Sequence, residues 1–297
     1  MNNEMSYLLG MICGNGEINT SSDVATVSIE IPHKKLTTED FHDVKIYVKA
    51  SVADIKDILE PLIGTRIQFT QVKSVTTLSF SKSKDDFLMR EIFRYIGNAV
   101  RHDNMRVHKD VFSFTTDQKK MFLRGFCDVT GYMRRTNAYF GIPYQHRVYI
   151  EVPNNWFMVI DICNLFKDIN IPVQNIDWAH PNIRDGNLIK YNQGNVFFWK
   201  KEHQIKIYAN EFLPVGFGIF NKMQALRTYS DELTAGFAVN GKSATDVTHR
   251  FYWEVADRTH KKPLHPSEND ISLPPQIRGK HYDSWKQIAR DLGYGKQ

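Results

Sequence analysis

The sequence predicts an α+β fold made of two similar halves. An apolar segment over 7–18 recurs at 122–132, and each copy carries glycines at helical intervals and ends in one, Gly16 or Gly131. Behind each copy, runs in which polar and apolar residues alternate predict strands, and runs with helical apolar spacing predict helices. Both observations predict two pseudo-symmetric halves of element order αββαββα.

The repeated helices are predicted to pack on each other. Gly10 and Gly14 lie one helical turn apart on one face, and Gly125 stands at the matching position of the second copy. Glycines spaced in this way leave a flat strip on which a second helix can approach closely. We therefore expect two halves related by a pseudo-twofold axis, with both helices ending at that axis.

Each element of the first half has its own signal. The helix over 5–13 comes first, and helices that open at Ser51 and Ser83 close at Gly64 and Gly97. Period-two alternation predicts four strands that together form an antiparallel sheet. They are expected at 24–31, 44–49, 65–72 and 75–80.

The second half repeats this order with longer loops. A helix opens at Asn155 or Asn154, and an insertion over 180–202 separates the last two strands. This insertion is either a loop that contacts a ligand or part of a strand with core aromatics. The remaining elements are predicted as helices over 117–128 and 210–227 and strands over 132–140, 147–152, 173–178 and 196–208.

Two nine-residue segments, Leu8–Gly16 and Leu123–Gly131, resemble the motif of the LAGLIDADG homing endonucleases in their single-chain, two-motif form. The resemblance covers the motifs and not the whole chain. It implies that the antiparallel sheets form a saddle for double-stranded DNA. It also implies a monomer, because both motifs lie in one chain.

In that family the eighth motif position is acidic in both copies, and the pair holds the divalent metals used for phosphodiester hydrolysis. Here those positions are Asn15 and Thr130, so the usual acids are replaced. The nearest acids, Glu17 and Asp128, are our candidates for a rebuilt catalytic site that binds Mg²⁺ or Mn²⁺. The alternative is that Asp128 is structural and that Glu17 is an ordinary exposed residue opening a strand.

Basic and polar residues complete the predicted site. The family also uses basic residues at strand edges to stabilise charge at the scissile phosphate, and Lys82 and Lys201 are our candidates for that role. Residues on the outward sheet faces or in the insertion are expected to contact DNA, although a shift of one residue in strand register would turn such a set inward. These residues are Lys45, Lys49, Arg66, Gln68, Lys73, Arg134, Arg147 and Arg184.

Charge and composition agree with a nucleic-acid partner. The net charge is +5, and the stretch 98–147 carries nine Lys or Arg against four acids, which is either a DNA-facing surplus or a solvated surface. Three cysteines without CxxC spacing argue against a zinc site and a disulfide framework. No basic leader or long apolar segment is present, so we expect a cytoplasmic protein with no membrane partner. No phosphate-binding loop, zinc-protease helix or hydrolase elbow occurs.

The predicted organisation is a first half over 1–97, a linker over 98–116, a second half over 117–228 and an extension over 229–297. The extension contains a capped helical stretch over 283–293 that either docks on the core or runs along DNA.

Three functions are compatible with these features. The first is a metal-dependent DNA endonuclease, of homing or restriction type. The second is a catalytically inactive DNA-binding regulator or an RNA-binding, maturase-like protein. The third is an unrelated α/β enzyme with a chance motif match.

Overall fold

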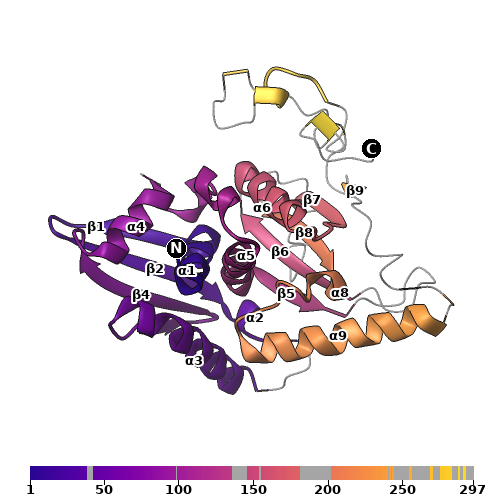
Figure 1. Ribbon diagram of the computed structural model, residues 1–297, viewed down its shortest axis with the longest axis horizontal. Helices are drawn as coiled ribbons and strands as arrows, with labels where there is room; N and C mark the ends of the chain where they lie inside the picture. The colour runs from indigo at the N-terminus through magenta and orange to yellow at the C-terminus, as the bar shows by residue number, and fades with distance from the viewer. Residues whose placement is uncertain are drawn as a thin grey trace.

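Two helices, α1 (Asn3–Asn15) and α5 (Thr116–Thr130), lie side by side between two sheets (Figure 1). The computed structural model describes residues 1–38, 43–97, 99–135, 146–153, 155–180, 202–239, 241, 243, 254–255, 268–269, 275–282, 287 and 290–291. Within these residues, the predicted α+β class with two sheet-bearing halves packed through the repeated helices is confirmed.

The contact between α1 and α5 is reciprocal. A Cβ atom added to Gly10 would lie 1.9 Å from the carbonyl oxygen of Phe122, and one added to Gly125 would lie 2.0 Å from that of Tyr7. The two contacts are equivalent, because Phe122 precedes Gly125 by three residues and Tyr7 precedes Gly10 by three residues. Only a residue without a side chain allows backbones to approach this closely. The predicted glycine strip is confirmed and generates the pseudo-twofold axis.

The first half forms an antiparallel sheet of order β1-β2-β4-β3. Its strands are β1 (Gly16–Thr20), β2 (Val24–Pro32), β3 (Gln68–Val72) and β4 (Val75–Ser83). Its helices are α2 (His33–Leu36), α3 (Val44–Ile63) and α4 (Phe87–Ile96). The strand directly after α1 was not among the predicted strands.

The predicted strand over 44–49 is wrong, because these residues are the first turns of α3. The carboxylate of Asp43 caps that helix by accepting hydrogen bonds from the backbone N–H groups of Lys45 and Ile46, at 3.0 and 3.1 Å. Val48 and Val52 are both buried one helical turn apart. The β-branched residues at 44–49 therefore fit both the strand period and the helix period, and the cap at Asp43 favours the helix.

The second half forms a sheet of order β5-β6-β8-β7-β9. Its strands are β5 (Gly131–Arg134), β6 (Arg147–Pro153), β7 (Asn175–His180), β8 (Glu202–Tyr208) and β9 (Glu254–Val255). Its helices are α6 (Trp156–Asp168), α8 (Ala209–Phe212) and α9 (Phe220–Val239). The predicted cap is confirmed at Asn155, whose side chain accepts a hydrogen bond from the N–H of Met158.

The predicted helix over 210–227 is two helices. Pro214 and Gly216, which has φ 64°, lie in the turn between α8 and α9, where a continuous helix is interrupted. α9 runs on past position 228, across the boundary expected between the second half and the extension. From that extension, β9 pairs in parallel with β7, and the short 3₁₀ helix η4 (Pro275–Ile277) is also described.

Residues of the predicted linker form an ion pair and hydrogen bonds with the second half. This segment contains the 3₁₀ helices η1 (His102–Asn104) and η2 (Lys109–Ser113). Arg106 makes a bidentate ion pair with Asp161 of α6, at 2.7 and 2.8 Å. The side-chain amide of Asn155 donates to the carbonyls of His102 and Met105.

Several predicted segments lie outside the described residues. These are 136–140, most of the insertion over 180–202, and most of the predicted helix over 283–293. Within the described part of the chain, no helix combines the length and the apolar character needed to cross a membrane.

Candidate nucleic-acid interface

Each sheet has one face packed on helices, and we call the opposite face its outer face. In the first sheet, Ala25, Val27 and Ile29 of β2 are buried on the helix side, so the alternate residues point outward. The strand register then defines the remaining residues of the outer face, which we call the first face. Its polar members are Glu17, Asn19, Thr26, Ser28, Glu30, Gln68, Thr70, Thr77, Ser79, Ser81 and Ser83.

The first face carries hydroxyl, amide and carboxylate groups. The hydroxyls of Thr26 and Ser81 lie 2.8 Å apart across β2 and β4, and Glu17 accepts a hydrogen bond from the amide of Asn19 at 3.2 Å. No Lys or Arg belongs to this face within β1 to β4, all of whose residues are described. Its only ionisable groups are Glu17 and Glu30, so its formal charge is negative.

Most of the residues predicted to contact DNA in the first half do not lie on this face. Lys45 and Lys49 lie on α3 instead of a strand. Arg66 precedes β3, and Lys73 lies in the turn between β3 and β4 with φ 54°. Only Gln68 lies on the first face as predicted.

The second sheet has a different outer face. Met133, Val148 and Ile150 are buried on the helix side, and the register places the alternate residues together on the other side. We call this the second face. On β5, β6 and β8 its members include Tyr132, Arg134, Arg147, Tyr149, Glu151, Gln204, Lys206 and Tyr208, and the register adds Asn175 and Asp177 of β7. Tyr149, Gln204 and Lys206 are buried, whereas Arg134 and Arg147 are partly exposed.

Cations and aromatic rings alternate on the second face. Tyr132 and Tyr149 stack with their ring centroids 5.5 Å apart, and the ammonium of Lys206 lies 5.6 Å from the ring of Tyr149. The guanidinium of Arg147 lies 5.1 Å from the ring of Tyr208. Arg134 is the register partner of Arg147, so both arginines lie on the outer face as predicted. The predicted contact Arg184 lies outside the described residues.

At the helix ends, the two replaced motif residues bind the protein itself. The amide of Asn15 donates to the carbonyl of Val129 across the axis, at 3.0 Å. The hydroxyl of Thr130 donates to the carbonyl of Phe126 in its own helix, at 2.6 Å. Neither residue brings a negative charge to the axis.

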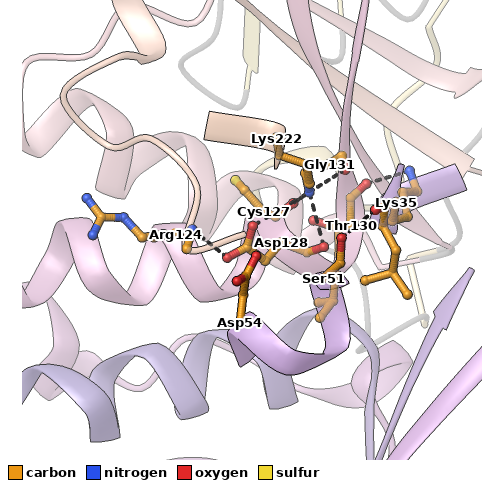
Figure 2. Close-up of polar contacts among 12 residues, drawn as sticks. Lys35, Ser51, Asp54, Arg124, Cys127, Asp128, Thr130, Gly131 and Lys222 are labelled. Carbon is orange, nitrogen blue, oxygen red and sulfur yellow. Dashed lines mark hydrogen bonds and ion pairs between the residues drawn. The ribbon is translucent and has the colours of Figure 1, made fainter. Parts of the chain in front are cut away.

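Asp128 is fully buried and has structural partners (Figure 2). Its carboxylate accepts hydrogen bonds from the hydroxyl of Tyr7 at 2.7 Å and the N–H of Gly218 at 2.8 Å. Its other oxygen lies 3.7 Å from the ammonium of Lys222. Burial raises the pKa of Asp128, and Lys222 opposes that rise.

Asp128 therefore ties the segment before α9 to the helix pair. The predicted partner carboxylate, Glu17, lies on the first face and bonds Asn19. The structure thus does not bring Glu17 and Asp128 together. Among the residues that it describes, no group of three or more His, Cys, Asp or Glu side chains could hold a metal ion.

One of the two predicted catalytic lysines lies away from the helix ends, and the other lies outside the described residues. Lys82 is on the helix side of β4 and pairs at 3.0 Å with Asp86, the residue that caps α4. Lys201 is outside the described residues.

Two buried lysines that sequence reasoning missed converge on the end of α5 (Figure 2). Lys35, from α2, lies 2.5 Å from the carbonyl oxygen of Thr130, 2.7 Å from a carboxylate oxygen of Glu151 and 4.3 Å from the ring centroid of Tyr132. Lys222, from α9, donates to three carbonyls of the last turn. They are those of Cys127, Asp128 and Gly131, at 3.0 to 3.2 Å. A helix C-terminus favours cations, but nothing in the spacing of the sequence pairs these lysines with α5.

Lys35, Lys222, Glu151 and Asp128 form a cluster at the end of α5 in which each charged group shifts the pKa of its neighbours. Burial lowers the pKa of Lys35 to about 7, although Glu151 beside it favours the charged form. Burial also lowers the pKa of Lys222 to about 8, against the effect of Asp128. Burial would raise the pKa of Glu151, but Lys35 and Lys34 together outweigh it and lower that pKa to about 2.

The helix ends do not fit the divalent metal that the LAGLIDADG resemblance implies. A hard dication requires negatively charged oxygen ligands, and the motif side chains offer a neutral amide and a neutral hydroxyl. The ammonium of Lys35 already contacts the carbonyl of Thr130, the residue at the eighth motif position. A metal at this end of α5 would meet the like charges of Lys35 and Lys222.

Comparison with known proteins finds similarity to solved structures only. No protein-family model and no curated protein matches the chain. A variant of the homing endonuclease I-DmoI in complex with its target DNA and Mn is similar at 14% identity and a TM-score of 0.40, over 71% of this chain and 92% of that one. The LAGLIDADG meganuclease I-AabMI bound to uncleaved DNA is similar at 12% identity and a TM-score of 0.37, over 79% and 92%.

Full-length DUF199/WhiA from Thermatoga maritima is similar at 13% identity and a TM-score of 0.40, over 77% of this chain and 60% of that one. The helix pair and two antiparallel sheets described above are the arrangement that the motif resemblance implied. In fold the chain is thus similar to solved LAGLIDADG structures at TM-scores of 0.37 to 0.40.

Proposed function

We propose that this chain binds double-stranded DNA through the outer faces of its two sheets and that it does not cleave DNA at its helix ends. The observation that carries the binding proposal is the second face, on which Arg134 and Arg147 lie in register among tyrosines. Arginines fix a protein on phosphates and read guanine edges in the major groove, which admits a strand pair.

The first face complements this surface. Its amide and hydroxyl groups can donate to or accept from base edges, and its carboxylates can accept from cytosine amino groups. Sequence readout requires such groups, whereas affinity for any DNA depends on cations. We infer that the second face supplies most of the affinity and that the first face adds discrimination between sequences.

The proposal against cleavage rests on the helix ends. Asn15 and Thr130 replace both motif acids, Asp128 is buried among structural partners, and Lys35 contacts the end of α5. The alternative is an endonuclease of homing or restriction type that uses Mg²⁺ or Mn²⁺ with Glu17 as its remaining candidate acid. Glu17 alone supplies a single carboxylate, whereas dications at phosphoryl-transfer sites are held by carboxylates together with phosphates and waters.

One selection experiment separates these functions. The protein is incubated with randomised duplex DNA in EDTA, Mg²⁺ or Mn²⁺, and the bound and cut pools are sequenced. We expect an enriched sequence in the bound pool under all three conditions and no cut ends. Metal-dependent cut ends that disappear in Glu17→Gln would establish the nuclease alternative. Preferential binding to RNA hairpins added as competitor would establish the RNA-binding alternative.

A matched pair of variants tests the surface. Arg134→Gln/Arg147→Gln removes two cations from the second face, and Lys45→Gln/Lys49→Gln removes two from α3. We expect the first variant to lose DNA affinity and the second to retain it. Equal losses would assign the binding to net charge instead of the second face.

A further inference from the structure

We propose that the ammonium group of Lys35 takes the electrostatic place of a divalent metal at the end of α5, so that this chain carries a built-in cation at its axis. The inference concerns the protein alone and does not depend on DNA binding.

The geometry around Lys35 resembles the surroundings of a bound cation. A backbone carbonyl oxygen at 2.5 Å and a carboxylate oxygen at 2.7 Å converge on one buried nitrogen, and the ring of Tyr132 lies 4.3 Å away. The carbonyl belongs to Thr130, whose side chain stands where the resemblance implies a metal-binding acid. The side chain of Lys35 is only 3% exposed, so its interactions are weakly screened by solvent.

The contacts also join the two halves. Lys35 comes from α2 of the first half, whereas Thr130, Tyr132 and Glu151 belong to the second half. The ammonium stabilises the negative end of the α5 dipole, which is one thing that a bound metal would do. Lys34 shares the same carboxylate oxygen of Glu151 at 2.7 Å and is 45% exposed. Two ammonium groups therefore face one carboxylate, and the cluster keeps a positive charge while both lysines are protonated.

This arrangement accounts for the neutral motif residues. In the LAGLIDADG family the acids at these two motif positions ligate metal ions, and the ammonium group of Lys35, while it is protonated, removes that need here. It also predicts that restoring the acids alone would not restore a metal site. The added carboxylates would pair with Lys35, and a dication would still have to approach an ammonium group.

The test is titration of the protein with Mn²⁺ alone, by calorimetry and by electron paramagnetic resonance of free Mn²⁺. Three proteins are compared, namely the wild type, Asn15→Asp/Thr130→Asp, and the same double variant with Lys35→Met. We expect no saturable site in the wild type. The triple variant should bind at least about tenfold more tightly than the double variant, a difference of about 1.4 kcal/mol.

Lys119→Met added to the double variant is the matched control. Lys119 is also a buried lysine of low exposure that pairs with a carboxylate, that of Asp168, near the other end of α5. Its removal should leave the Mn²⁺ affinity of the double variant unchanged. Thermal melting verifies that each variant is folded, and Lys35→Gln replaces Lys35→Met if the latter is not.

Two results would overturn the inference. One is a stoichiometric Mn²⁺ site in the wild type. The other is equal Mn²⁺ affinity in the double variant with and without Lys35. Because no DNA is present, either result leaves the proposed DNA binding intact, and a failure to bind DNA leaves this inference intact.

Discussion

The outer faces of the two sheets have the same position in their halves and opposite electrostatic character. The first face bears Glu17 and Glu30 among hydroxyls and amides, with no cation. The second bears Arg134, Arg147 and the buried Lys206 among tyrosines, and its register positions include the two acids Glu151 and Asp177. The helices between them pack by a reciprocal glycine contact. A repeat can therefore keep its packing symmetry while its surface chemistry diverges.

The difference follows from what each position must satisfy. At the axis, Gly10 and Gly125 are fixed by backbone atoms about 2 Å from where a Cβ would be, so the two copies cannot diverge there. On the outer faces no such steric limit acts, and side chains are set by the ligand and by neighbours across the strands. A symmetric core and asymmetric faces should therefore respond differently to substitution.

The largest effect is expected at the axis. Gly10→Ala and Gly125→Ala each place a methyl group against a carbonyl oxygen of the opposite helix. Each should cost about 3 kcal/mol of unfolding free energy or more, and the two costs should be similar. Chemical denaturation measures both. A large cost for one glycine and a negligible cost for the other would contradict the symmetric core.

The second effect is an acid dependence at Glu151 of the second half, which pairs with Lys34 and Lys35 of the first half. The pKa of Glu151 falls to about 2 in the folded state because Lys35 and Lys34 outweigh burial. Its contribution to stability is therefore complete above pH 4.5 and is lost as the pH falls toward 2. That loss amounts to about 3 kcal/mol. Denaturation between pH 5 and 2 should show a smaller loss of stability in Glu151→Gln than in the wild type and in Glu17→Gln. The loss that remains in Glu151→Gln comes from other acids with lowered pKa values, such as Glu60 and Asp86.

DNA affinity should separate the faces next. Arg134→Gln/Arg147→Gln should weaken binding by about 2 kcal/mol and reduce the slope of log K against log salt by about 2. Fluorescence anisotropy over a salt series measures both quantities. An unchanged slope would show that these arginines do not neutralise phosphates.

The smallest effect has the opposite sign. Glu17→Gln/Glu30→Gln removes the negative charge of the first face and should strengthen non-specific DNA binding by about 1 kcal/mol. Discrimination between cytosine and other bases should decrease at the same time. Binding to the selected site and to randomised DNA is compared in one competition assay. Weaker binding to both would assign the carboxylates a structural role.

The sequence was sufficient for the architecture and insufficient for the site. Glycine spacing predicted the helix pair because a close backbone approach leaves a local signature, and Asn155 was correctly predicted as a helix cap. The alternation at 44–49 failed because β-branched residues also fit one face of a helix once Asp43 caps it. That single error placed Lys45 and Lys49 on the wrong element.

The cluster at the end of α5 could not be predicted from sequence. Lys35, Glu151 and Lys222 are far apart in the chain, and each is an ordinary charged residue in its own segment. They meet only because α2, β6 and α9 are all packed around one helix end. Asp128 shows the same limit, because its partners Tyr7 and Gly218 lie about 90 to 120 residues away.

The reciprocal glycine contact and the contacts of Lys35 join each half to the other. A fragment ending near Gly97 would expose the grooved side of α1 and leave Lys35 without its acceptors on the other half. A fragment beginning near Ala99 would expose the matching side of α5, with Arg106 still fastened to Asp161. The exposed sides of α1 and α5 in these two fragments are complementary, because each glycine packs against the backbone of the other helix. We expect a chain severed between Gly97 and Ala99 to recover its fold only when both pieces are present.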